Sequence, residues 1–336
     1  MIRKIFKIFF GLFVGCSLVV TGSFYLAATS WRSKADAEVS IPRGASVRTI
    51  AALLSKEGVI ATPRLLELFV RFKGIAGSLK AGTYDFPEGT NMLSVLEKLE
   101  KGDIREYELV IIEGWTIDDI AKAIEGKAFV ADDNAPAEFK RLAMDRSFAK
   151  ELGIDATPSL EGYLFPDTYK VSYPLDVKVL LARLVGRFNE VWRELTRELG
   201  DGGVPKNELI TLASIVEKET GAPSERALIA GVFKNRLQQG MLLQSDPTII
   251  YGLPNFDGVI RKNDISNPHS YNTYVHSGLP PGPICNPGRA SLAATLRPEE
   301  TDYIYFVSKN DGTHFFSETL TDHINAVKRY REINGR

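Results

Sequence analysis

The clearest helix pattern in the chain is NELITLASIVEKET, residues 207–220. Pro205 precedes this stretch, Asn207 can cap its first turn, and Gly221 with Pro223 ends it. On a helical wheel its leucine, isoleucine and valine side chains gather on one face, which predicts that this face packs against the core of a domain. The remaining side is expected to be polar and contains three residues: Thr211, Ser214 and Lys218.

Two glutamates of this helix, Glu217 and Glu219, fall on opposite borders of the apolar face. Glu219 follows Leu212 and Ile215 at helical spacing, whereas Glu217 follows Ser214. Glu219 should therefore lose more water, and burial raises the pKa of a carboxyl group. A carboxyl that is still protonated near neutral pH can act as a general acid on a glycosidic oxygen. The alternative is that both are ordinary boundary glutamates, one of them paired with a nearby cation.

Polar side chains are concentrated in two segments downstream of this helix. A second helix, expected over 224–239, is followed by LQSDPTIIYG (243–252) and then by SYNTYVHSGLPPGPICNPG (270–288). Their hydroxyl, amide and carboxylate groups are candidates for binding sugar hydroxyls or orienting the glutamate. For Asp246 a turn role before Pro247 is equally plausible, and for the tyrosines core packing is the alternative. The candidate substrate-binding residues are Gln244, Ser245, Asp246, Tyr271, Asn272 and Thr273.

Other chemistries have little support in the sequence. The four histidines, His269, His276, His314 and His323, form no paired ligand motif, and P-loop, dinucleotide and GxSxG patterns are missing. We therefore expect no metal and no cofactor. The 41 basic and 42 acidic residues nearly cancel, whereas nucleic-acid-binding proteins usually carry a basic excess, so we expect no nucleic-acid partner.

Three similar phrases precede these segments, at 41–58, 86–102 and 111–127. Each has an extended apolar start, a glycine, a residue able to cap a helix, and apolar residues three, six and ten positions after the glycine. That spacing predicts a strand, a glycine turn and a capped amphipathic helix in each phrase. The first two phrases resemble LysM-type modules that bind N-acetylglucosamine polymers, although a purely structural role is the competing interpretation.

The N-terminus has the pattern of a membrane anchor. Residues 8–28 form an uncharged run of 21 residues, about the thickness of a hydrocarbon core. Residues 1–34 carry five basic and no acidic residues, so the positive-inside rule predicts a cytoplasmic N-terminus. A cleaved signal peptide and a lipoprotein cleavage box are the weaker alternatives. Cys285 would then be the one exported cysteine, which favours a packing role.

These motifs, taken together and in this order, resemble the YceG-like (MltG) family of endolytic murein transglycosylases. The resemblance covers essentially the whole chain and is specific because several long motifs recur. The residues that carry it are AGTYDF (81–86), EGYLFPDTY (161–169), VEKET (216–220), LQSDPTIIYG (243–252), the YNTY to NPG run (271–288), and YIYFV with GTHFFS (303–317).

The resemblance implies a single-pass inner-membrane enzyme with a LysM-like module and a periplasmic catalytic domain. It implies internal cleavage of nascent glycan strands to 1,6-anhydro-N-acetylmuramic acid ends, a possible role as a terminator of glycan elongation, and peptidoglycan synthases as partners. The essential glutamate of the family lies in the EKET motif, which gives Glu219, with Glu217 in reserve. The alternative function is a non-catalytic, membrane-anchored scaffold that binds peptidoglycan.

The expected fold class is α+β, with a mixed α/β catalytic domain. The expected organisation comprises a cytoplasmic N-terminus (1–7), a transmembrane helix (8–28), a linker (29–38), a LysM-like module (39–127), a connecting segment (128–160) and a YceG-like catalytic domain (161–336).

Overall fold

A computed structural model describes residues 25–155, 157–219, 221–254 and 256–333, together with residues 15, 19, 22 and 23. Most of the predicted span 8–28 lies outside these residues. Within them, none of the helices combines the length and the apolar character needed to cross a bilayer. The described chain separates into two compact units. Unit 1 reaches to Glu108 and includes Lys127–Asp132 and Lys170–Leu175, and unit 2 contains Leu109–Gly126, Asp133–Tyr169 and the chain from Asp176 onward.

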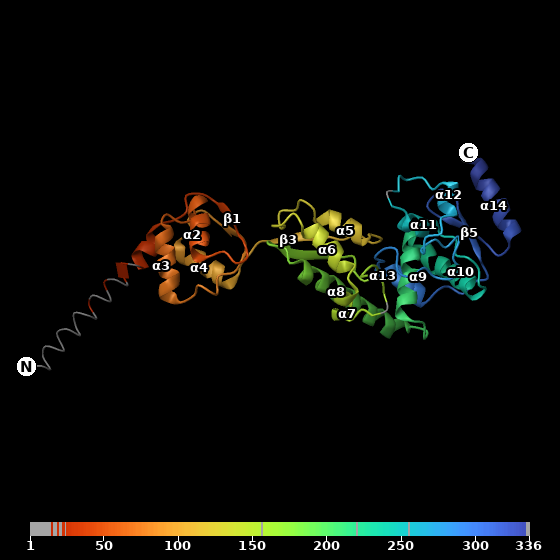
Figure 1. The fold of residues 1–336 in the computed structure, drawn as a ribbon, viewed down its shortest axis with the longest axis horizontal. Coiled ribbons are helices and arrows are strands. Elements are labelled where there is room, and N and C mark those ends of the chain that lie inside the picture. The colour runs from red at the N-terminus through yellow and green to blue at the C-terminus, as the bar shows by residue number, and fades with distance from the viewer. Residues whose placement is uncertain are drawn as a thin grey trace, which may run out of the picture. The chain divides into compact units, whose positions relative to one another are not determined.

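Unit 1 is a small α+β module (Figure 1). Its elements in order are β1 (Ala37–Ile41), α2 (Val47–Lys56), α3 (Pro63–Lys73), β2 (Gly82–Phe86) and α4 (Met92–Lys101). Strands β1 and β2 pair antiparallel, with Ala37 opposite Phe86 and Ile41 opposite Gly82. The helices bury their apolar faces with Tyr84 and Phe86 in one core, which makes this module a hydrophobic unit of its own.

The predicted pattern of strand, glycine turn and capped helix is confirmed in all three phrases. The third phrase forms β3 (Glu106–Val110) and α5 (Ile117–Ile124). Each glycine has a left-handed backbone that favours glycine, with φ of +73° at Gly44, +83° at Gly89 and +79° at Gly114. Each cap accepts a hydrogen bond from the backbone amide of the third residue of its helix: Ser46 from Thr49, Asn91 from Ser94, and Thr116 from Asp119.

The third phrase belongs mainly to unit 2, although the sequence predicts one module over 39–127. The division falls at Glu108, inside that range. Helix α5 packs on α6 (Ala135–Ala143), and the Gly114 amide donates to the Asn286 carbonyl at 2.9 Å. The local pattern is thus shared by the three phrases, but long-range contacts decide to which unit each helix belongs.

Unit 2 is mostly helical with short strands, so the α+β class is confirmed (Figure 1). Strands β5 and β6 of this unit pair antiparallel in a two-stranded sheet. Helix α14 packs on β5 and β6. The elements after α6 are α7 (Arg146–Glu151), β4 (Thr168–Ser172), α8 (Val177–Leu199), α9 (Lys206–Glu219), the 3-10 turn η1 (Pro223–Glu225), α10 (Arg226–Gln238), α11 (Asp246–Gly252), α12 (Lys262–Ile265), α13 (Arg289–Leu296), β5 (Tyr305–Ser308), β6 (His314–Ser317) and α14 (Leu320–Ile333).

Helix α9 is more deeply buried than its sequence predicts. It packs against α10, α11 and α13, and every residue from Leu209 to Val216 is buried. Thr211 and Ser214, expected on a polar face, are 1% and 0% exposed and donate to helix carbonyls. The wheel prediction was wrong for these two because serine and threonine can satisfy their hydroxyls inside a helix.

The start of α9 also differs from the prediction. Asn207 does not cap the helix, because its Oδ1 accepts a hydrogen bond from the Tyr163 hydroxyl at 3.2 Å. The amides of Glu208 and Leu209 donate instead to the Pro205 carbonyl. The helix therefore begins at Lys206, one residue before the predicted position.

The proline-rich loop lies against α9. Residues 282–288 are buried, and the Ile284 amide donates to Ser214 Oγ at 3.0 Å. Cys285 is a free, buried thiol, as its predicted packing role requires. At Gly162, with φ of +86°, a Cβ would lie 2.5 Å from the Pro283 ring, so only glycine fits there. This packing joins the segment around residue 162 to α9.

Candidate active site

Glu219 ends α9 in a partly exposed position, where its Oε1 accepts a short hydrogen bond from the Ser245 hydroxyl. Burial is the main influence on this carboxyl and raises its pKa to about 7. The Ser245 hydrogen bond and the charge of Arg236 lower the pKa, whereas the charge of Asp246 raises it. The group is therefore substantially protonated near neutral pH, as a general acid must be.

Ser245 is held by the segment that contains the predicted polar residues. Its amide donates to Thr273 Oγ1 at 3.0 Å, and the Gln244 amide donates to the Thr273 carbonyl at 3.1 Å. Gln244 has φ of +49°, an uncommon value for a residue with a side chain. Ser245 occupies the N-cap position of α11, but its hydroxyl does not cap that helix. The hydroxyl is instead committed to Glu219.

Asp246 and Gln244 are exposed on either side of the buried Ser245. The Tyr274 hydroxyl donates to Asp246 Oδ1 at 2.7 Å, which fixes the carboxylate beside Glu219. Burial, the hydrogen bond to Asp246 and the nearby acid charges raise the pKa of Tyr274, so it stays a neutral donor. Three of the predicted residues, Gln244, Ser245 and Asp246, thus lie at the end of α9 with Glu219.

Arg236 is a functional candidate that the sequence did not indicate. Its side chain is buried, with Nε donating to the Ile304 carbonyl at 2.6 Å and Nη1 to the Leu243 carbonyl at 2.7 Å. The guanidinium lies over the Tyr305 ring, 5.4 Å from its centroid. This cation acts on the Glu219 carboxyl from α10. An arginine within an ordinary helix pattern carries no signal that would have revealed this position.

Glu217, the reserve candidate, lies in a different environment. Its Oε2 accepts from the Gly288 amide at 2.8 Å, and its Oε1 lies 3.5 Å from Arg226 Nη2. A Cβ at residue 288 would fall 1.8 Å from the Glu113 carboxylate, which explains the glycine of the NPG run. Glu217 is therefore engaged in a buried ion pair that joins α9 to α10 and α13.

The other predicted binding residues support the loop beside α11. Asn272 is 0% exposed, and its Nδ2 donates to the carbonyls of Ile265 and Asn267 at 3.0 and 2.7 Å. Thr273 is also buried and bonds the Ser245 segment. Tyr271 is half-buried, with its ring 4.8 Å from that of Tyr251. The polar atoms of Asn272 and Thr273 are thus committed to the protein, and sugar binding by the three residues stays a prediction.

Glu161 is a second buried carboxyl that sequence reasoning missed. It is 2% exposed, and burial raises its pKa to about 8. It borders a cavity of about 580 Å³, which also contacts Lys218 on α9 and three residues of α11. The available signal was its place as the one acid in the otherwise apolar and aromatic run LEGYLF (160–165).

The histidines are in structural positions. His314 Nδ1 lies 2.7 Å from Glu225 Oε2, His323 stacks on Tyr305, and His269 packs under Gly252. Among the described residues there is no group of three or more His, Cys, Asp or Glu side chains arranged to hold a metal ion.

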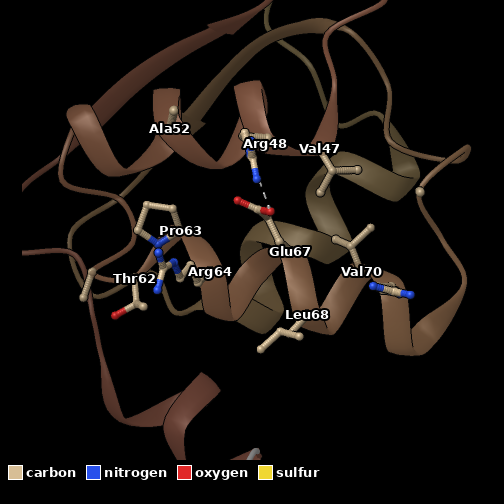
Figure 2. Close-up of a pocket in the computed structure, with 12 residues that line it drawn as sticks. Val47, Arg48, Ala52, Thr62, Pro63, Arg64, Glu67, Leu68 and Val70 are labelled. Atoms are coloured by element: carbon tan, nitrogen blue, oxygen red, sulfur yellow. Dashed lines mark ion pairs between the residues drawn. The ribbon is translucent and has the colours of Figure 1, made fainter.

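Unit 1 contains a cavity of a different kind, of about 1010 Å³, between α2 and α3. Arg48 and Glu67 point toward each other across it, at 4.0 Å (Figure 2). Arg64, Arg71 and apolar side chains complete its lining. The lining of this cavity thus holds one carboxylate among three guanidinium groups.

Comparisons with known proteins identify chains that are similar over most of this sequence. The model of the YceG-like family matches residues 39–329. An endolytic murein transglycosylase of Bacillus subtilis is 31% identical, over 93% of this chain and 91% of its own. One from Streptococcus pneumoniae is 29% identical, over 87% of this chain and 58% of its own. The crystal structure of a yceG-like protein of Listeria monocytogenes covers 88% of this chain and all of its own, at 30% identity and a TM-score of 0.58.

Proposed function

The chain belongs to the YceG-like family, and from this premise we propose that Glu219 is the general acid of an endolytic murein transglycosylase, a lyase that cleaves peptidoglycan glycan strands internally. The observation that carries the proposal is the Glu219 carboxyl itself. It is partly exposed at the end of α9, is held by Ser245, and has a pKa raised by burial to about 7.

The reaction needs one carboxyl in two protonation states. Glu219 first gives its proton to the glycosidic oxygen between N-acetylmuramic acid and N-acetylglucosamine, and the bond from the anomeric carbon to that oxygen breaks. The C6 hydroxyl of the same muramic acid then attacks the anomeric carbon and gives its proton to the Glu219 carboxylate. The product is a 1,6-anhydro end, and the enzyme regains its starting state. Intramolecular attack removes the entropy cost of a second reactant.

The neighbours of Glu219 suit both steps. Because the Ser245 hydroxyl donates to Oε1, the transferable proton is carried by Oε2. Once the proton has left, the Ser245 hydrogen bond and the Arg236 cation stabilise the carboxylate, while Asp246 favours its return to the protonated form. These opposing influences keep the pKa close to neutrality, where an acid–base catalyst works best.

The test is fragment release from purified murein by Glu219→Gln and Glu217→Gln proteins, with products identified by mass spectrometry. We expect Glu219→Gln to lose activity at least about 10²-fold and Glu217→Gln to keep most of its activity once it is shown to be folded. Anhydro ends are one water lighter than reducing ends. Wild-type release of reducing ends alone would exclude the transglycosylase route, and full activity of Glu219→Gln would exclude this acid.

We further propose that the N-terminal part holds the enzyme near its substrate. The uncharged run 8–28 with basic residues before it supports a single-pass inner-membrane anchor, with the catalytic domain in the periplasm. The order β1, α2, α3, β2 with antiparallel strands supports a LysM-like module that binds glycan. Peptidoglycan synthases are the proposed partners, and termination of glycan elongation is the proposed role. Membrane fractionation of full-length protein and of a variant without residues 1–28 tests the anchor.

A further inference from the structure

Glu161 contacts Tyr251 of α11, and both of its carboxyl oxygens are engaged by the protein. The Ile117 amide is 3.2 Å from each oxygen, Asn286 Nδ2 donates to Oε1 at 2.9 Å, and the Tyr251 hydroxyl is 3.3 Å from Oε2. Asn286 is itself fully buried, and its Oδ1 accepts from the amides on both sides of residue 163. Both carboxyl oxygens of Glu161 are therefore engaged by protein groups, although the residue borders the cavity of about 580 Å³.

The charge state of Glu161 decides what it can do in this network. Burial raises its pKa to about 8, helped by the acid charges of Asp118 and Asp119 on α5. The hydrogen bonds from Ile117 and Tyr251 act in the opposite direction but are weaker than burial. The other titratable groups that face Glu161 are Tyr271 and Cys285, and burial raises the pKa of each. Near neutral pH the carboxyl is uncharged and has its own proton to donate.

Among these partners of Glu161, Tyr251 is the one that can accept a hydrogen bond from that proton. The two other partners, the Ile117 amide and Asn286 Nδ2, are donors and cannot accept it. The Tyr251 hydroxyl, which donates to Oε2 in the structure, can also accept a hydrogen bond, so the pair persists when Glu161 is protonated. This hydrogen bond is part-buried, and removing Tyr251 from it leaves the buried Glu161 carboxyl with one partner fewer, which is costly.

Tyr251 belongs to α11, the same helix that begins beside the general acid. Ser245 and Asp246 lie at its start, next to Glu219, and Tyr251 is five residues further on, about 7 Å along the helix. One side of α11 faces a cavity of about 580 Å³, which is lined by Pro247, Ile250 and Tyr251. Packing on that side is incomplete, so the helix needs a polar anchor at its C-terminal end.

We propose that Glu161 is a positioning residue, which fixes α11 through Tyr251 and thereby holds the Ser245 hydroxyl on Glu219. The proposal rests on the proposed function of Glu219. It assigns Glu161 no direct contact with substrate, because its oxygens are already occupied. A neutral hydrogen-bond donor of the same shape should replace it, whereas an apolar side chain should not.

The experiment compares Glu161→Gln, Glu161→Leu and Tyr251→Phe, with Tyr169→Phe as a matched control. Tyr169 is also buried, but its hydroxyl bonds the Phe165 carbonyl, away from α11. We expect Glu161→Gln to keep kcat within about threefold, because a glutamine amide donates to Tyr251 as the neutral acid does. Glu161→Leu should lower kcat by about 10- to 100-fold with a smaller effect on KM, since misplacement by about 1 Å costs that much. Tyr251→Phe should lie between them, and Tyr169→Phe should match the wild type.

Two further readouts separate positioning from a general loss of structure. The basic limb of the pH profile should move to higher pH in Glu161→Leu and Tyr251→Phe, because the Ser245 hydrogen bond that lowers the pKa of Glu219 is weakened. Backbone amides of α11 should exchange hydrogen faster in both variants than in the wild type and Glu161→Gln. If Glu161→Leu does not fold, Tyr251→Phe and Glu161→Gln carry the comparison.

The outcomes that overturn the proposal are distinct. A loss in Glu161→Gln equal to that of a Glu219→Gln variant would make Glu161 a second catalytic carboxylate. Wild-type kcat in both Glu161→Leu and Tyr251→Phe would remove any role. If the wild-type protein releases no fragments, the proposed function fails, and the exchange of the α11 amides still decides whether Glu161 fixes this helix.

Discussion

Glu219 shows how a single carboxyl can be prepared for acid catalysis by its neighbours. Burial favours the neutral acid, while Ser245 and Arg236 favour the carboxylate. The enzyme must begin each cycle with the acid protonated, so activity is lost as the pH rises through the pKa. We expect kcat/KM to fall by about tenfold per pH unit above pH 7. The measurement is initial fragment release between pH 5 and 9, and a flat profile from pH 7 to 9 would contradict it.

Ser245→Ala tests the contribution of the Ser245 hydrogen bond to Glu219. Removing the donor raises the pKa of Glu219, because Ser245 lowers it in the wild type. The basic limb should therefore move upward, by about 0.7 pH unit for a hydrogen bond of about 1 kcal/mol. We also expect kcat to fall by about tenfold, since the carboxyl is held less firmly. Ser266→Ala, on the exposed end of α12, is the control, and an unmoved limb in Ser245→Ala would refute this role.

The sequence located part of this site and not the rest, for physical reasons. Glu219 and Ser245 lie in motifs with helix and turn patterns, so their neighbourhood could be predicted from local spacing. Glu161 and Arg236 come close to the site only through tertiary packing, 58 residues before Glu219 and 17 after it. Asn272 shows the opposite case. It lies in a recognisable motif, but its side chain donates to carbonyls of its own loop.

Among the elements, the helices that begin after a glycine turn were the most predictable. A left-handed glycine and a capping side chain are local requirements, and Gly114 with Thr116 meets them regardless of its surroundings. The burial of α9 on all sides was not predictable, because it depends on the loop 282–288 that lies against Ser214. Local chemistry thus determined where elements start, and nonlocal packing determined which faces are covered.

Asn286→Ala tests the network that joins these elements. The Asn286 side chain bonds the amides of Gly162 and Leu164, the Trp115 carbonyl and Glu161, all at 2.9 Å. Alanine leaves these buried groups without partners, each at a cost of about 1–3 kcal/mol. We expect the free energy of unfolding to fall by about 3 kcal/mol or more in urea titrations.

Asn263→Ala, at an exposed position on α12, is the matched control for Asn286→Ala and should change the free energy of unfolding by less than about 0.5 kcal/mol. Equal stability of the two variants would show that the Asn286 network is not a stabilising feature.

At the scale of the whole molecule, the two units have separate hydrophobic cores and different electrostatic demands. The core of unit 1 is formed by residues before position 100, and a core of unit 2 by residues after position 211. The carboxyls with pKa values of about 7 and 8, Glu219 and Glu161, both belong to unit 2. A change of pH above neutrality should therefore act mainly on the stability of unit 2.

The direction of this effect follows from proton binding. Between pH 6.5 and 8 an unfolded chain has both glutamates ionised, whereas the folded protein retains protons on them, so folding takes up protons and stability falls as pH rises. A fully protonated Glu161 contributes up to about 1.4 kcal/mol per pH unit. Burial lowers the pKa of His269 and His323, so these two release protons on folding near the lower end of this window and act in the opposite direction there. Burial lowers the pKa of Lys206 to about 8, so the loss of its proton in the folded protein affects the free energy of unfolding mainly near pH 8, the upper end of this window.

Glu161→Gln isolates the contribution of one group, because glutamine keeps the hydrogen bonds but does not titrate. We expect the unfolding transition of unit 2 to shift less between pH 6.5 and 8 in this variant than in the wild type, with stability gained at pH 8. Calorimetry at steps of half a pH unit measures this transition. Glu208→Gln, at an exposed position on α9, is the control. A pH dependence equal to that of the wild type would mean that Glu161 is ionised in the folded protein, with the Tyr251 hydroxyl donating to its carboxylate.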